Sequence, residues 1–214
     1  MRLSVFGAGL LAVAVSTGPA SAAVVISEWM YDGSEFIEFT NTGPAAVNFA
    51  GWSFDDSTRT FGSLSLSGFG TVASGEAVLV SQDTPAAFRA TWGLPETVKV
   101  IQNIGADNLL QRGDEINLYN SDDDLADRLT YADNGAAGGP RTNNASGNIA
   151  PANFGTNNAP LATLSAIGDA YGSYSVTAGT NTVIGNPGNV PEPTGLAALA
   201  IAGMIGLRRR RVAV

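Results

Sequence analysis

The stretch Glu35-Phe36-Ile37-Glu38-Phe39-Thr40-Asn41-Thr42-Gly43 decides the fold class of this chain of 214 residues. Aromatic and β-branched residues fill it, and Asn and Gly, which favour turns, end it. Phe36 and Ile37 interrupt a clean alternation of apolar and polar residues. The stretch predicts a β-strand followed by a turn, and more strands of this kind are expected on either side of it.

Short apolar or alternating runs, separated by turn residues, continue along most of the chain. In Val47–Asp55, Trp52 and Phe54 fall on one face, which is typical of a half-buried strand. Trp52 is also the strongest candidate for the central aromatic residue of a core. Further strands are expected at Val24–Met30, Thr60–Leu66, Ala77–Ser81, Val98–Gln102, Glu115–Tyr119 and Leu125–Tyr131. Short strands at this spacing predict an all-β protein with an antiparallel β-sandwich.

One short helix is expected within this pattern. Thr84 is a residue type that caps helix N-termini, Pro85 fits the first helical position, and Gly93 suits the C-terminus. Phe88 and Trp92 are four residues apart and share one helical face. The sequence therefore predicts a helix that begins at Pro85 and ends at Trp92.

The composition changes after the last of these strands. Residues 134–189 are rich in Gly, Asn, Ala and Pro and show little periodicity, which predicts an extension that packs partly on the sandwich. Within it, Leu161–Leu164 and Tyr171–Thr177 could each add a strand. The body of the protein is accordingly divided into a β-sandwich at residues 23–133 and an extension at residues 134–189.

The N-terminal segment, residues 1–22, has the order of a secretory signal peptide. Met1-Arg2 supplies positive charge, Leu3–Val15 is apolar, and Ala20-Ser21-Ala22 offers small residues for cleavage. Cleavage after Ala22 would begin the mature chain at Ala23. The alternative is a buried N-terminal helix, which fits less well because the apolar run has no polar face.

The C-terminal segment, residues 190–214, contains a second targeting pattern. An apolar run, Thr194–Leu207, follows Val190, Pro191, Glu192 and Pro193 and precedes Arg208, Arg209, Arg210 and Arg211. As a helix this run would span roughly 21 Å at about 1.5 Å per residue, short of a hydrocarbon core of about 30 Å. It predicts a short transmembrane helix whose arginines stay on the cytoplasmic side.

This order of motif, apolar helix and arginine cluster closely resembles the PEP-CTERM sorting signal of Gram-negative-type bacteria. The resemblance implies recognition by an exosortase, a membrane-embedded cysteine transpeptidase that cuts near the Pro-Glu-Pro motif, and transfer of the protein to the cell surface. A simple membrane anchor that is not cleaved is the alternative. In both cases the protein is anchored in the inner membrane, transiently or permanently, with its body outside.

Composition restricts the chemistry of the body. The chain has a net charge of −8; five of its eleven basic residues but only one of its nineteen acidic residues lie in the two terminal segments, so the body is near −12. Such acidity disfavours nucleic-acid binding. The chain contains no Cys and no His, which excludes disulfides, Ser-His-Asp and Cys-His catalytic sites, and His-based zinc sites.

Several segments of the body together resemble the lamin tail domain. They are Val25–Glu28, Glu35–Gly43, Val47–Asp56, Ala73–Glu76, Gly113–Tyr119 and Asp127–Tyr131. In addition, Gly185-Asn186-Pro187-Gly188 is similar to a closing turn that often follows such domains. The resemblance implies an immunoglobulin-like β-sandwich from Val24 to about Tyr131, and a binding or structural module with no shared active site.

The densest group of carboxylates consists of Asp122, Asp123 and Asp124 with Asp127 and Asp133, and its first four members are the metal candidates. Several oxygen ligands are what calcium prefers, so this group is a candidate calcium site. A solvated turn fits the spacing better, because adjacent residues of an extended chain point to opposite sides. Calcium is the only cofactor that the sequence suggests, and no metal ligand is assigned.

Two other groups of residues are candidate sites for sugars. A glycoside hydrolase would need a pair of carboxylates, for which the candidates are Glu28, Glu35 and Glu38. An aromatic platform for sugar rings could be built from Trp29, Trp92 and Tyr31. Nothing in the sequence brings two of the glutamates into one cleft, and such aromatic residues more often lie in a core, so no catalytic residue is assigned.

The expected protein is thus an exported, surface-sorted bacterial module with a structural, adhesive or binding role and no enzymatic activity. Its expected partners are the export machinery and an exosortase, with extracellular polysaccharide or envelope proteins as further candidates. Its expected location is the cell envelope, the surface or the extracellular matrix. A calcium- or carbohydrate-binding extracellular protein is the main alternative, and a carboxylate-based hydrolase is a third.

Overall fold

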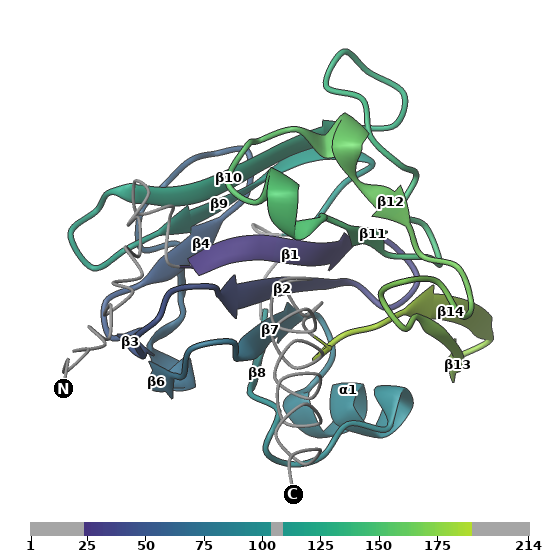
Figure 1. Cartoon of the computed structure of the whole chain (residues 1–214), viewed down its shortest axis with the longest axis horizontal. Helices are drawn as coiled ribbons and strands as arrows, with labels where there is room; N and C mark the ends of the chain where they lie inside the picture. Colours follow the sequence, from purple (N-terminus) through teal and green to yellow (C-terminus); the bar gives the residue numbers. More distant parts are fainter. Residues whose placement is uncertain (1–23, 104–108, 190–214) are drawn as a thin grey trace, which may run out of the picture.

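The computed structural model describes residues 24–103 and 109–189 of the chain (Figure 1). The expected signal peptide with its cleavage residues, and the expected sorting segment at residues 190–214, lie outside the described residues. In the part of the chain that is described, no helix is both long enough and apolar enough to cross a membrane.

Two sheets form the sandwich. The larger has six strands in the spatial order β12 (Thr163–Leu164), β11 (Gly147–Asn148), β1 (Val24–Met30), β2 (Phe36–Asn41), β7 (Ala77–Ser81) and β8 (Val100–Gln102). The smaller has four strands in the order β10 (Leu125–Ala132), β9 (Gly113–Tyr119), β4 (Ser53–Asp55) and β5 (Leu64–Ser65). The short strands β3 (Val47–Asn48) and β6 (Thr71–Val72) pair separately.

The main core lies between these two sheets. The larger sheet contributes Ile26, Trp29, Ile37, Phe39 and Val78, and the smaller contributes Phe54, Ile116, Leu118, Leu129 and Tyr131. The register of β1 against β2 shifts between Ile26 and Glu28. Such a bulge changes which residues face each side of the sheet, so Ile26 and Trp29 both point into the core although their spacing is odd.

The outer face of the larger sheet is also covered, which explains why β2 does not alternate. Phe36 packs there against Phe88 and Trp92 of α1 (Pro85–Trp92), while Ile37 packs into the main core. The hairpin of β13 (Tyr174–Ala178) and β14 (Asn181–Gly185) completes this second layer. Figure 1 shows α1 and the hairpin on the side of β1 and β2 away from β9 and β10.

The helix forms as its sequence predicts. Thr84 Oγ1 accepts a hydrogen bond of 3.2 Å from the Ala87 amide, and Pro85 occupies the first turn. Gly93 ends the helix in the left-handed conformation at φ 65°, which glycine adopts at little cost. Capping at both ends therefore fixes the helix over eight residues.

The extension contributes to the sheet as well as to its cover. β11 pairs with β1, and β12 pairs with β11. Three 3₁₀ turns are also present in the described residues: η1 (Ser67–Phe69), η2 (Pro151–Asn153) and η3 (Ala159–Leu161). The hydrogen bonds of β11 and the burial of Val183 from β14 show that residues 147–185 are packed on the sandwich.

Three expectations from the sequence are corrected. β7 and β8 run parallel, so the larger sheet is not purely antiparallel. The expected strand Val47–Asp55 is split by a turn in which Gly51 has φ 81°, and Thr60–Leu66 contributes only β5. Trp52 is not the central core residue, because it is half-buried against Phe49, whereas Trp29 is fully buried between the sheets.

Candidate functional site

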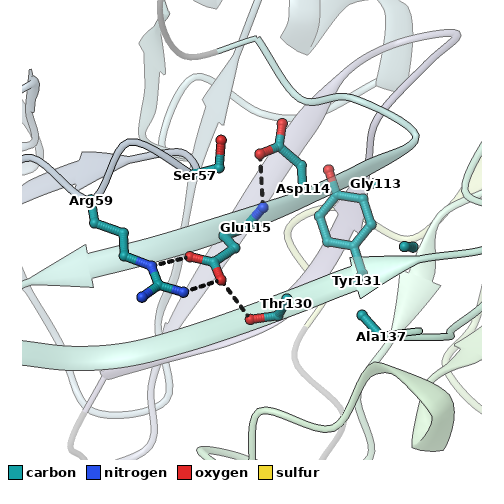
Figure 2. A pocket seen from close by; sticks show the side chains of 9 residues that line it. Ser57, Arg59, Gly113, Asp114, Glu115, Thr130, Tyr131 and Ala137 are labelled. Atoms are coloured by element: carbon teal, nitrogen blue, oxygen red, sulfur yellow. Dashed lines mark hydrogen bonds and ion pairs between the residues drawn. The ribbon is translucent and has the colours of Figure 1, made fainter. Parts of the chain in front are cut away.

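A shallow pocket lies on the smaller sheet, where β9 and β10 meet the turn at residues 56–60. Its volume is about 540 Å³. Figure 2 shows the side chains that surround it, among them Ser57, Arg59, Asp114, Glu115 and Thr130. Because strands position most of these side chains, the pocket is a rigid surface feature.

An ion pair organises one side of the pocket. Arg59 donates from Nε and Nη2 to the two carboxylate oxygens of Glu115, at 2.7 Å each, and Thr130 Oγ1 donates to Glu115 Oε1 at 3.1 Å (Figure 2). The hydrogen bonds from Arg59 lower the pKa of Glu115 to about 2. Glu115 is therefore ionised at neutral pH, and its planar two-point pairing fixes the guanidinium.

The local backbone brings Arg59 to this position. Arg59 has φ 57°, an uncommon conformation for a residue with a side chain. The buried carboxylate of Asp55 holds the turn, because its Oδ2 accepts from Thr58 Oγ1 at 2.8 Å and from the Thr60 amide at 2.5 Å. No local sequence pattern indicates that this turn carries a cation to β9.

The far side of the pocket contains Asp114 and Tyr131 (Figure 2). Asp114 accepts hydrogen bonds from the amides of Gln111 and Glu115 at 2.9 and 2.8 Å. Burial, and secondly the charge of Asp114, raise the pKa of the Tyr131 hydroxyl. Tyr131 is thus a neutral core residue, and the open part of the pocket presents a nearly neutral Arg59–Glu115 pair suited to a polar ligand.

A second site is formed by two buried carboxyl groups on the outer face of the larger sheet. Glu28 of β1 and Glu38 of β2 are directly opposed in the strand register, and their exposed fractions are 0% and 1%. Burial raises the pKa of both groups, in the case of Glu38 to about 7. The structure therefore brings together two of the three candidate glutamates, but in the interior, away from the pocket at Arg59 and Glu115.

The closing turn, residues 185–188, covers this carboxyl pair. Glu28 Oε1 accepts a hydrogen bond from the Asn186 amide at 2.9 Å, and Glu38 Oε2 accepts one from the Gly188 amide at 2.7 Å. Ser146 and Ser27 donate their hydroxyls to Glu28 and Glu38 respectively. The pair thus ties the extension to the centre of the larger sheet.

Glu35, the third candidate glutamate, lies elsewhere. Its Oε1 accepts a hydrogen bond from the Leu110 amide at 3.0 Å. The charged groups that interact with it are Asp114 and Asp32. Burial raises its pKa to about 8. Glu35 is therefore separated from the Glu28–Glu38 pair, and the arrangement does not supply two carboxylates on either side of a substrate cleft.

The acidic candidates for calcium do not converge. Asp122, Asp123 and Asp124 occupy the exposed turn between β9 and β10, where Asn120 Oδ1 accepts from the amides of Asp122 and Asp124. Asp127 instead points between the sheets and accepts from the Ile26 amide at 2.8 Å. Within residues 24–103 and 109–189, no three acidic side chains form a group that could hold a metal ion.

The proposed aromatic platform for sugars is contradicted by the structure. Trp29, Trp92 and Tyr31 are 0%, 2% and 8% exposed. Trp29 and Tyr31 pack with Tyr131 in the main core, and Trp92 packs with Phe36 under α1. These rings stabilise the two layers and present no surface for stacking.

Sequence reasoning missed the carboxyl pair because its formation depends on register. The bulge in β1 places Glu28 on the outer face opposite Glu38, and no local pattern reports the register between two strands. The only available signal was the closing turn, whose amides are now seen to bind these two carboxyl groups.

The chain was also compared with known proteins. A family model described as the Lamin Tail Domain matches residues 17–133, which is more than half of the chain. No curated protein sequence matches the chain. The matched region ends at the close of β10, before the strands of the extension.

Proposed function

The chain belongs to the lamin tail domain family, and from that premise we propose that it is an exported bacterial module with a structural or adhesive role at the cell surface, processed by an exosortase. The observation that carries the proposal is the order of the sequence. A signal-peptide pattern precedes the lamin tail domain, and a PEP-CTERM-like segment follows it.

The body is consistent with a load-bearing or adhesive role outside the cell. Its interior is packed on both faces of the larger sheet, so stability rests on two apolar clusters without disulfides. Its acidity keeps it soluble and lets it attract cations or basic surfaces. The family assignment supports a binding or structural module in preference to an enzyme.

The proposal is tested by fractionation of a bacterium that has an exosortase and produces the full chain. We expect the wild-type protein in the surface and extracellular fractions. Glu192→Gln in the Pro-Glu-Pro motif should shift it to the inner-membrane fraction, whereas Glu96→Gln, at a side chain that is 89% exposed in the body, should behave as wild type. Wild-type protein in the cytoplasm with residues 1–22 attached would refute the proposal.

Binding of a saccharide is a second candidate, favoured by the pocket at Arg59 and Glu115. The Arg59–Glu115 pair offers donors and acceptors with little net charge, which suits a neutral ligand rich in hydroxyl groups. Titration of the protein with saccharides, followed by NMR, should shift the amides of β9 and β10. Arg59→Gln should abolish the shifts and Lys99→Gln, which breaks a different ion pair, should not; the absence of shifts with every saccharide would eliminate this candidate.

A further inference from the structure

The carboxyl pair holds the closing turn on the larger sheet through two of the turn's amides. The Asn186 side chain adds a second contact, since its Oδ1 accepts from Asn148 Nδ2 at 2.9 Å and from Ser173 Oγ at 3.0 Å. The amides of Asn186 and Gly188 donate to Glu28 and Glu38, and Pro187 between them has no amide hydrogen. A Cβ added at Gly185 would lie 3.1 Å from Glu28 Oε1 and 3.0 Å from Ser146 Oγ. The turn therefore fits closely over the pair and excludes water from it.

Within residues 24–103 and 109–189, no positive charge acts on the pair to balance it. Among the described residues, the ionisable groups that act on Glu28 are Glu38 and Asp169, and no Lys or Arg contributes. Asp169, in the loop before β13, stays ionised: burial opposes this, but hydrogen bonds from the amides of Ala166 and Ser173 lower its pKa. Tyr174 of β13 faces the same region and donates its hydroxyl to the Trp92 carbonyl at 2.7 Å.

Two opposed carboxylates in such a place cannot both be ionised without a large cost. Like charges directly opposite one another on neighbouring strands destabilise a sheet, and burial increases the penalty. Glu28 Oε2 is buried and has no hydrogen-bond partner in the part of the chain that the structure describes, so a second negative charge would be poorly solvated. Two carboxyl groups in this situation titrate as a pair, and the first to ionise raises the pKa of the second.

We infer that the Glu28–Glu38 pair is a proton-dependent latch that holds residues 185–189 against the sheet and releases them when the pair loses its last proton. Lifting the closing turn is the opening that lets water reach the carboxylates with the smallest free-energy cost. The alternative is to separate β1 from β2, which would break the centre of the larger sheet and expose the main core.

The latch lies next to the segment expected to be processed. Gly188 is bound to Glu38, and Val190-Pro191-Glu192-Pro193 begins two residues later. A closed latch holds residues 185–188 against the body just before this motif, and an open latch would leave these residues free for a processing enzyme to bind. This consequence rests on the proposed function, whereas the latch itself does not.

Hydrogen exchange of the purified full-length chain tests the latch directly. After correction for the intrinsic pH dependence of exchange, protection of the Asn186 and Gly188 amides should fall by at least tenfold between about pH 6 and about pH 8.5, because each pH unit past the titration corresponds to about a tenfold change. The amides of β9 serve as the internal reference and should keep their protection. Equal protection of Asn186 and Gly188 at both pH values, relative to β9, would overturn the inference.

Two variants separate the latch from general effects of charge. Glu38→Gln keeps the shape of the side chain but cannot ionise, so protection at Asn186 and Gly188 should no longer depend on pH. Glu96→Gln removes a carboxylate that is 89% exposed and should retain the wild-type response. A pH response that survives in Glu38→Gln would also overturn the inference, and the wild-type titration remains decisive if that variant fails to fold.

The link to processing has its own readout. In a host with an exosortase, Glu38→Gln should be processed at a rate that no longer changes with external pH. If exchange shows the latch but processing is absent, the proposed function fails and the latch stands. If the protein is processed but exchange is independent of pH, the latch fails and the proposed function stands.

Discussion

The pH dependence of stability is the most direct quantitative consequence of the buried carboxyl pair. Burial raises the pKa of Glu38 from 4.5 to about 7. Between these two values the folded protein retains a proton that the unfolded chain has released. Unfolding therefore releases a proton in this window, and the free energy of unfolding must fall as the pH rises from 4.5 to about 7 and then level off.

The size of the effect follows from the same values. A difference of about 2.5 pKa units corresponds to about 3 kcal/mol at about 1.4 kcal/mol per unit. Burial also raises the pKa of Glu28 and of Glu35, so the wild-type slope in this window includes their contributions. The difference between wild type and Glu38→Gln isolates the contribution of Glu38, because the amide has no proton to lose.

Urea unfolding followed by tryptophan fluorescence measures this difference, since Trp29 and Trp92 are both buried. In Glu38→Gln, the side-chain oxygen can accept from the Gly188 amide and the side-chain nitrogen can donate to Ser27 Oγ. In the wild type, the Glu38 carboxylate accepts hydrogen bonds from both of these groups. At about pH 8, Glu38→Gln should exceed wild type by up to about 3 kcal/mol, and near pH 4.5 the two should be similar. Parallel stability curves for the two proteins from pH 4.5 to 8 would refute the reasoning, whatever their absolute values.

Three further outcomes follow from the packing and the acidic turn. Trp29→Ala should lower the free energy of unfolding, measured in urea, by about 3–5 kcal/mol. Trp52→Ala should lower it clearly less, because Trp52 is only half-buried, and equal losses would contradict the assignment of the core. Gly147→Ala should lower the melting temperature more than Gly68→Ala, because its Cβ would lie 2.7 Å from the Trp29 ring while the nearest atom at Gly68 is the flexible end of Ile101 at 3.3 Å; the reverse order would contradict the packing of β11 on β1. Millimolar calcium should leave the melting temperature unchanged, because the carboxylates at Asp122–Asp124 do not converge with Asp127; a rise that a chelator reverses would show a site there.

Local sequence signals were sufficient wherever the structure is determined by neighbours along the chain. The helix at Pro85–Trp92 was predicted to its ends, because Thr84 and Gly93 act on the backbone beside them. β1, β2 and β7 were predicted for the same reason, since dense apolar runs have few alternatives to a strand in a core. The family match agrees with the resemblance found in these segments.

Local sequence signals did not predict the interactions between segments that are distant along the chain. The choice of Trp29 over Trp52 for the main core depends on the bulge in β1 and on the turn that splits β3 from β4. The two-residue strand β11 contains Gly and Asn, which predict turns, yet it joins the sheet because Gly147 leaves room for the Trp29 ring. Tertiary contacts outweigh local preference at such positions.

The candidate sites show the same difference between local features, which the sequence predicted, and contacts between distant segments, which it did not. The turn character of Asp122–Asp124 was evident from the sequence, and the structure places these residues in an exposed turn. The Glu28–Glu38 pair and the Arg59–Glu115 pair each join segments whose register or separation the sequence does not reveal. In both cases the side chains were visible in the sequence, and their partners were not.

The mass of the protein recovered from the surface of a bacterium that produces the full chain and an exosortase tests the proposed export and processing most directly. Intact-mass and terminal-sequence measurements should give a chain that begins at Ala23 and ends near Pro191-Glu192-Pro193, without Arg208 to Arg211. A chain recovered intact from residue 1 to residue 214, in any fraction and with an active exosortase present, would contradict the account of an exported and processed lamin tail module.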